Sequence, residues 1–315
     1  MRTAQPDDGL RADGHAGINL RVGAVVVFYH PDAACYRNAN ELAKRVRCVV
    51  IDNTEGSAPG CNGNLDQRVD YLPSGINEGI ATALNRGVAR LLEIGCDVAL
   101  LFDQDSAPDE HLLIELPRAM SNLLRADPQT ALVGPAYVDD RLGGRTPTPF
   151  VRFAHGRLLR IPALGSTPVH TDFLISSGSC VNLRLWSRIG PMQDDLFIDF
   201  VDLEWCIRAK RKGFSLYGIP WVHMRHSLGG EPVRVFGRAY PSHSPTRHYY
   251  LFRNAVSLIL RRDIPWSWKS SELVKLPVRL VIYALFLQPR WRHLTMACNG
   301  IADGLRGRLG PLKLR

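Results

Sequence analysis

Two aspartates that stand one residue apart are the strongest chemical signal in the sequence. Asp103 and Asp105 follow the apolar residues 98–102. Such a run is typical of a central strand with both faces covered. Because alternate residues of an extended segment point the same way, the two carboxylates are expected to face a crevice at the carboxyl end of a sheet, where α/β folds bind ligands. Two hard oxygen donors there suit Mg²⁺ or Mn²⁺ bridging a diphosphate.

The same residues allow a second interpretation. Asp and Ser favour helix caps and Pro108 suits a first helical turn, so residues 103–106 also fit a polar turn that caps the next helix. This stretch alone leaves both interpretations open, and the elements around it must decide between them.

Two further β-branched runs precede the aspartates. Residues 23–31 stop at a proline, and residues 47–51 end in Asp52. Both look like parallel strands whose carboxyl ends meet at one edge. Helical spacing predicts helices over residues 33–45 and 76–93. The order strand, helix, strand, helix, strand therefore predicts a nucleotide-binding α/β half.

Motifs of two common nucleotide-binding folds are missing from the chain. No Gly-x-x-x-x-Gly-Lys-Ser/Thr phosphate loop occurs, and no Gly-x-Gly-x-x-Gly follows a predicted strand. The P-loop fold and the dinucleotide-binding fold both lose support.

With this arrangement the sequence resembles the family 2 glycosyltransferases, which are inverting enzymes of the GT-A fold, and among them the bacterial rhamnosyltransferase-like branch. The matching segments cover roughly residues 22–260 and are, in chain order, 26–31 (VVFYHP), 51–53 (IDN), 77–87 (NEGIATALNRG), 101–106 (LFDQDS), 176–179 (SSGS), 197–208 (FIDFVDLEWCIR), 226–229 (HSLG) and 247–254 (RHYYLFRN). Their order carries the resemblance more than any single segment does.

The resemblance implies an α/β fold with a Rossmann-like, mostly parallel central sheet flanked by helices. It also implies a glycosyltransferase of the hexosyltransferase type that uses a nucleotide-diphosphate sugar, with rhamnose from dTDP-rhamnose as the expected donor. The expected acceptor is a glycan or a lipid-linked acceptor in bacterial cell-surface polysaccharide synthesis. A galactofuranosyl or other hexosyl donor is an alternative. Two other classes of protein are also possible: a nucleotidyltransferase, which would be expected to have a glycine-rich phosphate loop, and an inactive nucleotide-binding scaffold.

Roles for individual residues follow from the same resemblance. Asp52 resembles the acid that hydrogen-bonds the donor's base, Asp103 the contact with ribose and metal, and Asp105 the direct metal ligand. His226 resembles the histidine that completes the metal site in several relatives, and His223 is its rival. The residues expected to bind the donor are Tyr29, Asp52, Asn77, Asp103, Ser179 and Arg253; those expected to bind Mg²⁺ or Mn²⁺ are Asp103, Asp105 and His226. A cation there would offset the charge that develops on a diphosphate leaving group.

Asp202 is the candidate catalytic base. An inverting transfer needs one carboxylate that takes the acceptor hydroxyl's proton as the oxygen attacks the anomeric carbon. Asp202 aligns with the family's base, although Val201 stands where an acidic residue is often found. Asp199 is the main competitor, because it could share a helical face with Asp202. A solvated helix start would explain why acids precede the basic residues Arg208, Lys210, Arg211 and Lys212. It would not explain the aromatic residues that stand between those acids.

Two other segments allow both a functional and a structural interpretation. Residues 176–179 fit an ordinary turn into a strand, or a loop near the donor diphosphate and the acceptor, as the family suggests. Arg247 and Arg253 fit a basic helix surface, or a phosphate contact beside the active site.

Composition agrees with a cytoplasmic enzyme. The chain has 315 residues, of which 45% are hydrophobic, enough for one large domain or for a domain with an appendage. Its seven cysteines include no Cys-x-x-Cys pair, which argues against a disulfide framework and a zinc ribbon. Residues 1–20 lack an apolar signal core and are expected to form a loose tail. Residues 21–260 are the expected GT-A domain, and residues 261–315 a basic helical extension.

The basic charge gathers at the C-terminus. From Arg247 onward the sequence holds 13 Lys or Arg and 3 Asp or Glu, whereas the whole chain has a net charge of +9. The tail also holds Trp266, Trp268 and Trp291, together with an apolar stretch, residues 280–287, that is too short to span a bilayer. These features predict peripheral contact with the inner face of the cytoplasmic membrane. No nucleic-acid motif accompanies them, and ordinary packing helices are the alternative.

Overall fold

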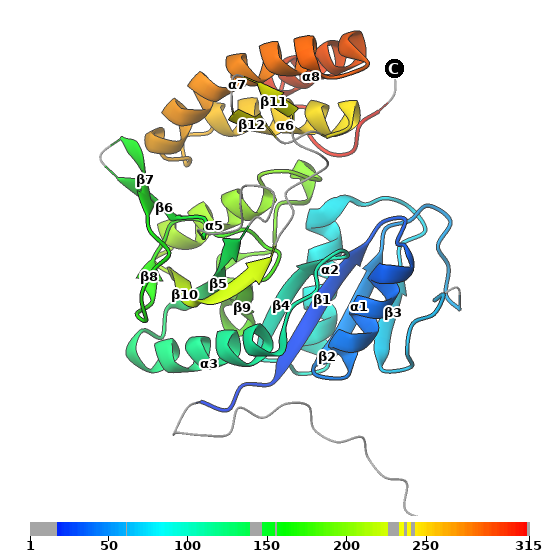
Figure 1. The fold of residues 1–315 in the computed structure, drawn as a ribbon, viewed down its shortest axis with the longest axis vertical. Coiled ribbons are helices and arrows are strands. Elements are labelled where there is room, and N and C mark those ends of the chain that lie inside the picture. The colour runs from blue at the N-terminus through cyan, green and yellow to red at the C-terminus, as the bar shows by residue number, and fades with distance from the viewer. Residues whose placement is uncertain are drawn as a thin grey trace, which may run out of the picture.

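The predicted strands belong to an eight-stranded sheet (Figure 1). The structure, a computed structural model, describes residues 18–60, 62–138, 147–154, 156–225, 233–235, 238–240 and 243–313. The strands of the sheet are β1 (Val22–Phe28), β2 (Arg47–Asp52), β3 (Val69–Pro73), β4 (Val98–Asp103), β5 (Thr130–Val138), β8 (Val169–His170), β9 (Cys180–Asn182) and β10 (Ser215–Arg225). Their order in space is β3-β2-β1-β4-β9-β5-β10-β8. The sheet is mostly parallel, as predicted; β9 and β8 run antiparallel to their neighbours.

Three parallel strands bring the acidic residues of the predicted nucleotide site to one edge. β1 lies between β2 and β4, with Phe28 opposite Asp52 and Val27 opposite Asp103. Valines 25 to 27 of β1 are all buried, as expected for a strand covered on both faces. Asp52 and Asp103 therefore flank the carboxyl end of β1.

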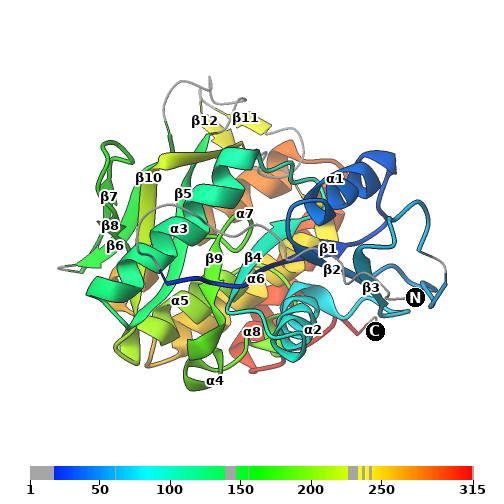
Figure 2. The same ribbon diagram turned by 90° about the horizontal axis from the view of Figure 1, so that it is seen from below.

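Helices cover both faces of the sheet (Figure 2). On one face lie α1 (Ala33–Ala43) and α3 (Glu110–Ala126), and on the other α2 (Gly79–Glu93) and α5 (Val201–Arg211). The two helices predicted from the sequence are confirmed. The second begins at Gly79 rather than at residue 76, because Asn77 Oδ1 accepts a hydrogen bond from the Gly79 N–H at 3.0 Å and turns the chain there.

The helix after β4 is capped by Asp109. Its Oδ1 accepts a hydrogen bond from the Leu112 N–H at 2.8 Å, and α3 begins at the next residue. The interpretation of residues 103–106 as the cap of this helix is therefore wrong, since a different aspartate satisfies the N-terminal amide.

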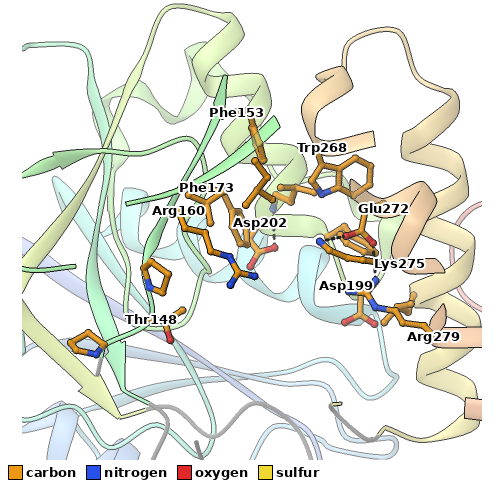
Figure 3. Close-up of a pocket in the computed structure, with 17 residues that line it drawn as sticks. Thr148, Phe153, Arg160, Phe173, Asp199, Asp202, Trp268, Glu272, Lys275 and Arg279 are labelled. Carbon is orange, nitrogen blue, oxygen red and sulfur yellow. Dashed lines mark hydrogen bonds and ion pairs between the residues drawn. The ribbon is translucent and has the colours of Figure 1, made fainter. Parts of the chain in front are cut away.

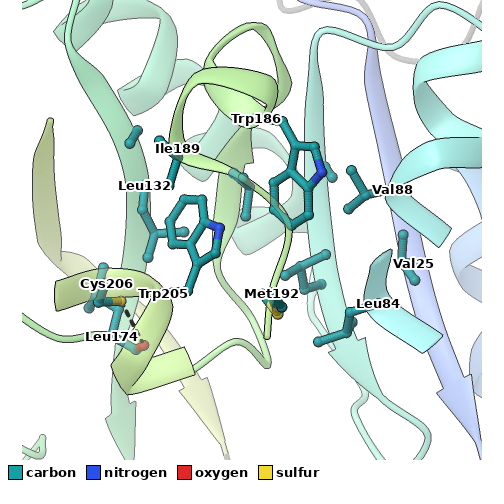
Figure 4. Packing of buried hydrophobic residues seen from close by; sticks show 14 of the residues in the cluster. Val25, Leu84, Val88, Leu132, Leu174, Trp186, Ile189, Met192, Trp205 and Cys206 are labelled. Atoms are coloured by element: carbon teal, nitrogen blue, oxygen red, sulfur yellow. Dashed lines mark hydrogen bonds between the residues drawn. The ribbon is translucent and has the colours of Figure 1, made fainter. Parts of the chain in front are cut away.

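Tight packing under the sheet holds the start of α5 in place (Figure 4). The rings of Trp186, in the short helix α4 (Trp186–Ile189), and Trp205, in α5, stack with their centroids 5.7 Å apart. The Trp205 indole N–H also donates to the Gly190 carbonyl oxygen at 3.0 Å. These contacts fix α5, whose second residue is Asp202, against the central strands.

Three helices form a layer over the carboxyl edge of the parallel strands (Figure 1). They are α6 (Pro245–Leu260), α7 (Trp266–Phe286) and α8 (Arg290–Leu305), which share an apolar core. α8 can approach α6 closely because Gly300 has no side chain. A Cβ at this position would lie 2.3 Å from the Tyr249 carbonyl oxygen. In the part of the chain that the structure describes, no helix is long and apolar enough to cross a membrane.

The remaining elements are small. Beside the helical layer stands a hairpin of β6 (Phe150–Ala154) and β7 (Arg157–Ile161). A second hairpin pairs β11 (Val233–Val235) with β12 (Arg238–Tyr240). Short 3₁₀ turns in the described part of the chain include η2 (Leu183–Leu185) and η3 (Asp194–Leu196).

Candidate active site

Asp52 is held in a fixed orientation at the end of β2. It is buried, with 4% of its surface exposed. Tyr71 Oη, on the neighbouring strand β3, donates to Asp52 Oδ2 at 2.7 Å, and the Thr54 N–H donates to Oδ1 at 2.9 Å. A carboxylate fixed in this way at the edge of a sheet can accept a hydrogen bond from a ligand with little loss of entropy.

The turn after β4 carries Asp103 and Asp105. Asp103 is half-buried, and its N–H donates to Ser177 Oγ at 3.2 Å, whereas Asp105 is exposed. Gln104, between them, accepts a hydrogen bond from the Tyr29 N–H at 2.7 Å. The turn is therefore tied both to the end of β1 and to the serine-rich loop before β9.

The donor set at this turn consists of oxygens. His226 lies outside the described residues, while its rival His223 is exposed on β10. Across the residues with a described position, no group of three His, Cys, Asp or Glu side chains is arranged to hold a metal ion. Two carboxylates nevertheless fit Mg²⁺ or Mn²⁺, because Mg²⁺ is commonly held by one or two carboxylates together with substrate phosphates and water.

Two more residues expected to bind the donor lie near this edge. Tyr29 follows β1 with 43% of its surface exposed, and its hydroxyl lies 3.3 Å from Glu55 Oε1. Asn77 caps the bend into α2. The second residue of that helix, Ile80, donates its N–H to the Phe197 carbonyl oxygen at 2.7 Å, which joins α2 to the loop before α5.

Asp202 lies at the N-terminus of α5 with its carboxylate turned into a cavity (Figure 3). The Leu203 N–H donates to Asp202 Oδ1 at 2.8 Å, and the Ser176 N–H lies 3.4 Å from Oδ2. Burial raises the pKa of Asp202 to about 6, and the negative charges of Asp199 and Asp103 add to the shift. A carboxylate with such a pKa is a stronger base than an ordinary aspartate and is still ionised at neutral pH.

Asp199 occupies strained backbone beside Asp202. Phe197, Asp199 and Phe200 all adopt positive φ angles, of 64°, 64° and 63°. Such conformations are costly for residues other than glycine and gather at functional sites. Arg247 Nη2 lies 3.1 Å from Asp199 Oδ1. Asp199 Oδ2 is buried and has no hydrogen-bond partner within the described residues.

The cavity beside Asp202 has a volume of about 690 Å³. It lies between the β6–β7 hairpin, the start of α5 and helix α7 (Figure 3). Its lining residues are Pro147, Thr148, Pro149, Val151, Phe153, Leu158, Arg160, Phe173, Asp199, Phe200, Asp202, Leu203, Leu251, Trp268, Glu272, Lys275 and Arg279. The volume falls in the range of small-molecule sites, roughly 300–1,000 Å³.

Ser179 and Arg253 are buried away from this cavity. Ser179 is fully buried and donates its hydroxyl to the Ile175 carbonyl oxygen at 2.6 Å. Arg253 is also fully buried, and its Nη2 donates to the carbonyl oxygens of Asp195 and Leu196 at 3.0 and 2.9 Å. Neither side chain is among those that line the cavity. In the structure both shape loops: Ser179 the loop before β9, and Arg253 the loop that leads to Asp199.

The α7 wall of the cavity was missed by sequence reasoning. Trp268 was expected at a membrane surface, and that expectation is wrong, since it is 4% exposed and lines the cavity. Trp266, two residues earlier and therefore about 200° around the helix, is 65% exposed. The α7 residues that line the cavity follow no motif. Helical periodicity is the one signal in the sequence that could have distinguished the buried Trp268 from the exposed Trp266.

Solved structures with a similar fold are glycosyltransferases. TarS of S. aureus (residues 1–349, with UDP-GlcNAc) superposes with a TM-score of 0.54 at 12% identity, over 92% of this chain and 82% of that one. GalNAc-T7 with UDP, GalNAc and Mn²⁺ gives 0.52 at 13% identity over 91% of this chain; the match spans 56% of GalNAc-T7. The fold is that of the GT-A glycosyltransferases.

The sequence relationship is closer. The chain is 30% identical to the dTDP-rhamnosyl transferase RfbF of Shigella flexneri over 299 residues, which are 93% of this chain and 98% of that protein. No family model matches the chain. The chain belongs to the glycosyltransferase family of RfbF. The predicted fold class and enzyme class are both confirmed.

Proposed function

We propose that the enzyme transfers rhamnose from dTDP-rhamnose, with inversion, to a glycan or lipid-linked acceptor in bacterial cell-surface polysaccharide synthesis. The choice of dTDP-rhamnose as donor is supported by the similarity to a dTDP-rhamnosyl transferase over almost the full length of both chains. In the proposed donor site, Asp52 hydrogen-bonds the base, Asp103 the ribose, and Tyr29 and Asn77 lie alongside.

Asp202 takes the proton in the proposed reaction. The acceptor hydroxyl lies against the Asp202 carboxylate, gives it its proton, and attacks the anomeric carbon on the face opposite the leaving nucleoside diphosphate. A new oxygen–carbon bond forms as the bond to the diphosphate breaks, so the configuration inverts. An acceptor bound against the apolar walls of the cavity would displace water, which would otherwise compete as the acceptor.

Asp103 and Asp105 are the proposed ligands of Mg²⁺ or Mn²⁺, with His226 as a third. The GalNAc-T7 structure, which contains UDP and Mn²⁺, supports the use of a divalent cation in this fold. A cation held there would offset the negative charge of the leaving diphosphate. The half-buried position of Asp103 and the exposed position of Asp105 leave one ligand fixed by the sheet and one open to the substrate.

A panel of nucleotide sugars tests this function. The purified protein is titrated with dTDP-rhamnose, UDP-galactofuranose and UDP-glucose, each with Mn²⁺, with Mg²⁺ and with a chelator, while binding and release of nucleoside diphosphate are followed. Metal-dependent selection of dTDP-rhamnose is expected. Selection of another sugar would replace the donor and keep the enzyme class, whereas binding of none of them would favour an inactive scaffold.

The C-terminal helices are proposed to rest on the inner face of the cytoplasmic membrane. On α7 the exposed apolar side chains recur at helical spacing and form the α7 stripe: Val274, Val278, Val281 and Leu285, with exposures of 71%, 46%, 55% and 55%. At its end the exposed Trp291 stands between the exposed Arg290 and Arg292. An apolar stripe next to a basic and aromatic turn fits an anionic lipid surface, where the side chains enter the interface and the cations meet the headgroups.

A further inference from the structure

We infer that Asn254 is a positioning residue of the active site, whose side chain holds the turn at residues 196–200 so that Asp199 stays beside Asp202. This role rests on the proposed function, because Asp202 is the proposed base. Both aspartates line the cavity in Figure 3, whereas Asn254, on α6, does not. Its effect on the reaction therefore passes through the turn.

The turn before α5 needs support from outside itself. Phe197, Asp199 and Phe200 all have positive φ angles, and none of them is a glycine. Such backbone persists only where the surrounding structure enforces it. Phe200 directly precedes α5 and has no polar side chain with which to cap the helix. Because Asp202 is the second residue of α5, the shape of this turn sets the position of the base.

Asn254 contacts the turn at three carbonyl oxygens. The side chain is fully buried, and its Nδ2 lies 2.8, 2.7 and 3.0 Å from the carbonyl oxygens of Leu196, Ile198 and Asp199. The last two carbonyls belong to the peptide planes on either side of the Asp199 Cα. Because the rotation of these planes defines φ and ψ of Asp199, one amide group fixes the backbone conformation of that residue.

Arg253 decides which way the Asn254 amide points. Its Nε donates to Asn254 Oδ1 at 2.9 Å, and because a guanidinium has donors only, the amide nitrogen must face the carbonyl oxygens. The segment after α8 holds the guanidinium in turn, since Arg253 Nη1 donates to the Gly310 carbonyl oxygen. The Gly310 N–H donates to the Asp195 carbonyl oxygen at 2.7 Å. Residues from three parts of the chain thus meet at this amide.

α6 holds Asp199 through two residues with different tasks. Arg247 pairs with the Asp199 carboxylate at 3.1 Å, and Asn254 holds the backbone. Without the Asn254 amide, the turn is free to relax toward ordinary φ angles, which moves Asp199 away from Asp202. Burial and the negative charge of Asp199 both raise the pKa of Asp202, so this movement lowers that pKa. A purely structural role for Asn254 would leave the pKa unchanged.

Asn254→Ala tests this role, and Asn254→Ser, which keeps a shorter donor, takes its place if the alanine variant does not fold. Ile282→Ala is the matched control, because Ile282 is buried in the apolar core of the same three helices and does not line the cavity. Each change is made in the wild type and in Asp199→Asn. The pKa of Asp202 is read from the ¹³C NMR signals of labelled aspartate carboxyls, with Asp202→Asn identifying the signal. Turnover, dTDP affinity and thermal melts are measured beside it.

The other charged and titratable groups around the two aspartates stay the same in these variants. They are Asp103, Arg160, His243, Arg247, Glu272, Lys275 and Arg279. A change in the pKa of Asp202 that depends on Asp199 therefore reports a movement of Asp199.

Asn254→Ala is expected to lower the pKa of Asp202, as Asp199→Asn does, and to lower kcat by about 10- to 100-fold while dTDP affinity stays unchanged. In the Asp199→Asn background it should move the pKa no further. Ile282→Ala should lower the melting temperature and leave the pKa and kcat unchanged. Equal pKa values in the Asn254 and Ile282 variants, or a shift that persists in full in the Asp199→Asn background, would overturn the inference. Absence of transfer and of donor binding in the wild type would instead contradict the proposed function, and the NMR titration would still decide whether Asn254 holds Asp199.

Discussion

Asp202 and Asp199 line one cavity, and burial together with the negative charge of Asp199 raises the pKa of Asp202 to about 6. The base must be ionised to accept a proton, so kcat/KM is expected to rise with pH and to level off above an apparent pKa near 6. Asp199→Asn removes the like charge and lowers the pKa of Asp202. The acidic limb of the pH–rate profile should then move to lower pH. An unmoved limb in Asp199→Asn would show that Asp199 does not act on the base.

Asp202→Asn is expected to lower turnover by about 10²- to 10⁴-fold while dTDP binds with unchanged affinity, because the variant removes the proton acceptor and leaves the donor edge intact. Rates and dTDP calorimetry check this, with Glu110→Gln, an exposed residue at the start of α3, as control. Wild-type-like turnover would contradict the assignment.

Asp202→Asn, which should lower turnover, is expected to raise thermal stability. The native pKa of Asp202, about 6, lies above its ordinary value of 3.8, so the folded state loses stability as the pH rises from 3.8 to 6 and bears the full cost above pH 6. Asp202→Asn should therefore melt at a higher temperature than the wild type at pH 8. The gain should shrink at pH 5, where the native carboxyl is mostly protonated. Thermal melts at both pH values measure it, and an equal gain at both would argue against the raised pKa.

Asp105→Asn should weaken Mn²⁺-dependent binding of dTDP-rhamnose by roughly tenfold or more, because it removes an exposed oxygen ligand. Binding in the presence of a chelator should not change. Glu93→Gln, an exposed charge at the end of α2, is the matched control. Equal loss of affinity with and without metal would place Asp105 outside the cation site.

Val281→Glu, in the α7 stripe, should reduce co-sedimentation with vesicles containing anionic lipid by about tenfold, because it puts a charge into the proposed membrane face. Leu92→Glu makes a comparable change at an exposed apolar residue of α2 and should have no effect. High salt should weaken wild-type binding. Equal binding of the two variants would mean that α7 does not meet the membrane.

Arg253→Gln should lower the free energy of unfolding by about 3 kcal/mol, because several buried carbonyl oxygens lose their donor. The salt dependence of dTDP binding should not change, since the buried guanidinium shapes the loop to Asp199. Denaturant melts and calorimetry separate the two effects. A selective loss of donor affinity at unchanged stability would restore the phosphate contact expected from the sequence.

Local patterns predicted β1, β2 and β4, three of the four strands in the first half of the sheet, and missed β3. The β-branched run of β1 and the apolar run of β4 are typical of parallel strands that are covered on both faces. The apolar residues between residues 76 and 93 recur at helical spacing, which predicts a helix that buries one face. Strands of two or three residues, such as β8 and β9, carry too little pattern to be seen. The antiparallel strand β9 between β4 and β5 therefore escaped sequence analysis. β5 and β10 were also not predicted, although these strands have nine and eleven residues.

The sequence by itself determined that carboxylates stand at the ends of its strands. Asp52, Asp103 and Asp105 follow apolar runs that must be buried, and because an unpaired carboxylate is costly to bury, these aspartates must lie at the edge of the sheet. The tertiary structure decided what surrounds Asp202. The left-handed turn at Asp199, the burial that shifts the pKa of Asp202, and the wall supplied by α7 join segments far apart in the chain. Contacts across such distances depend on how helices pack on the sheet, which no local spacing encodes.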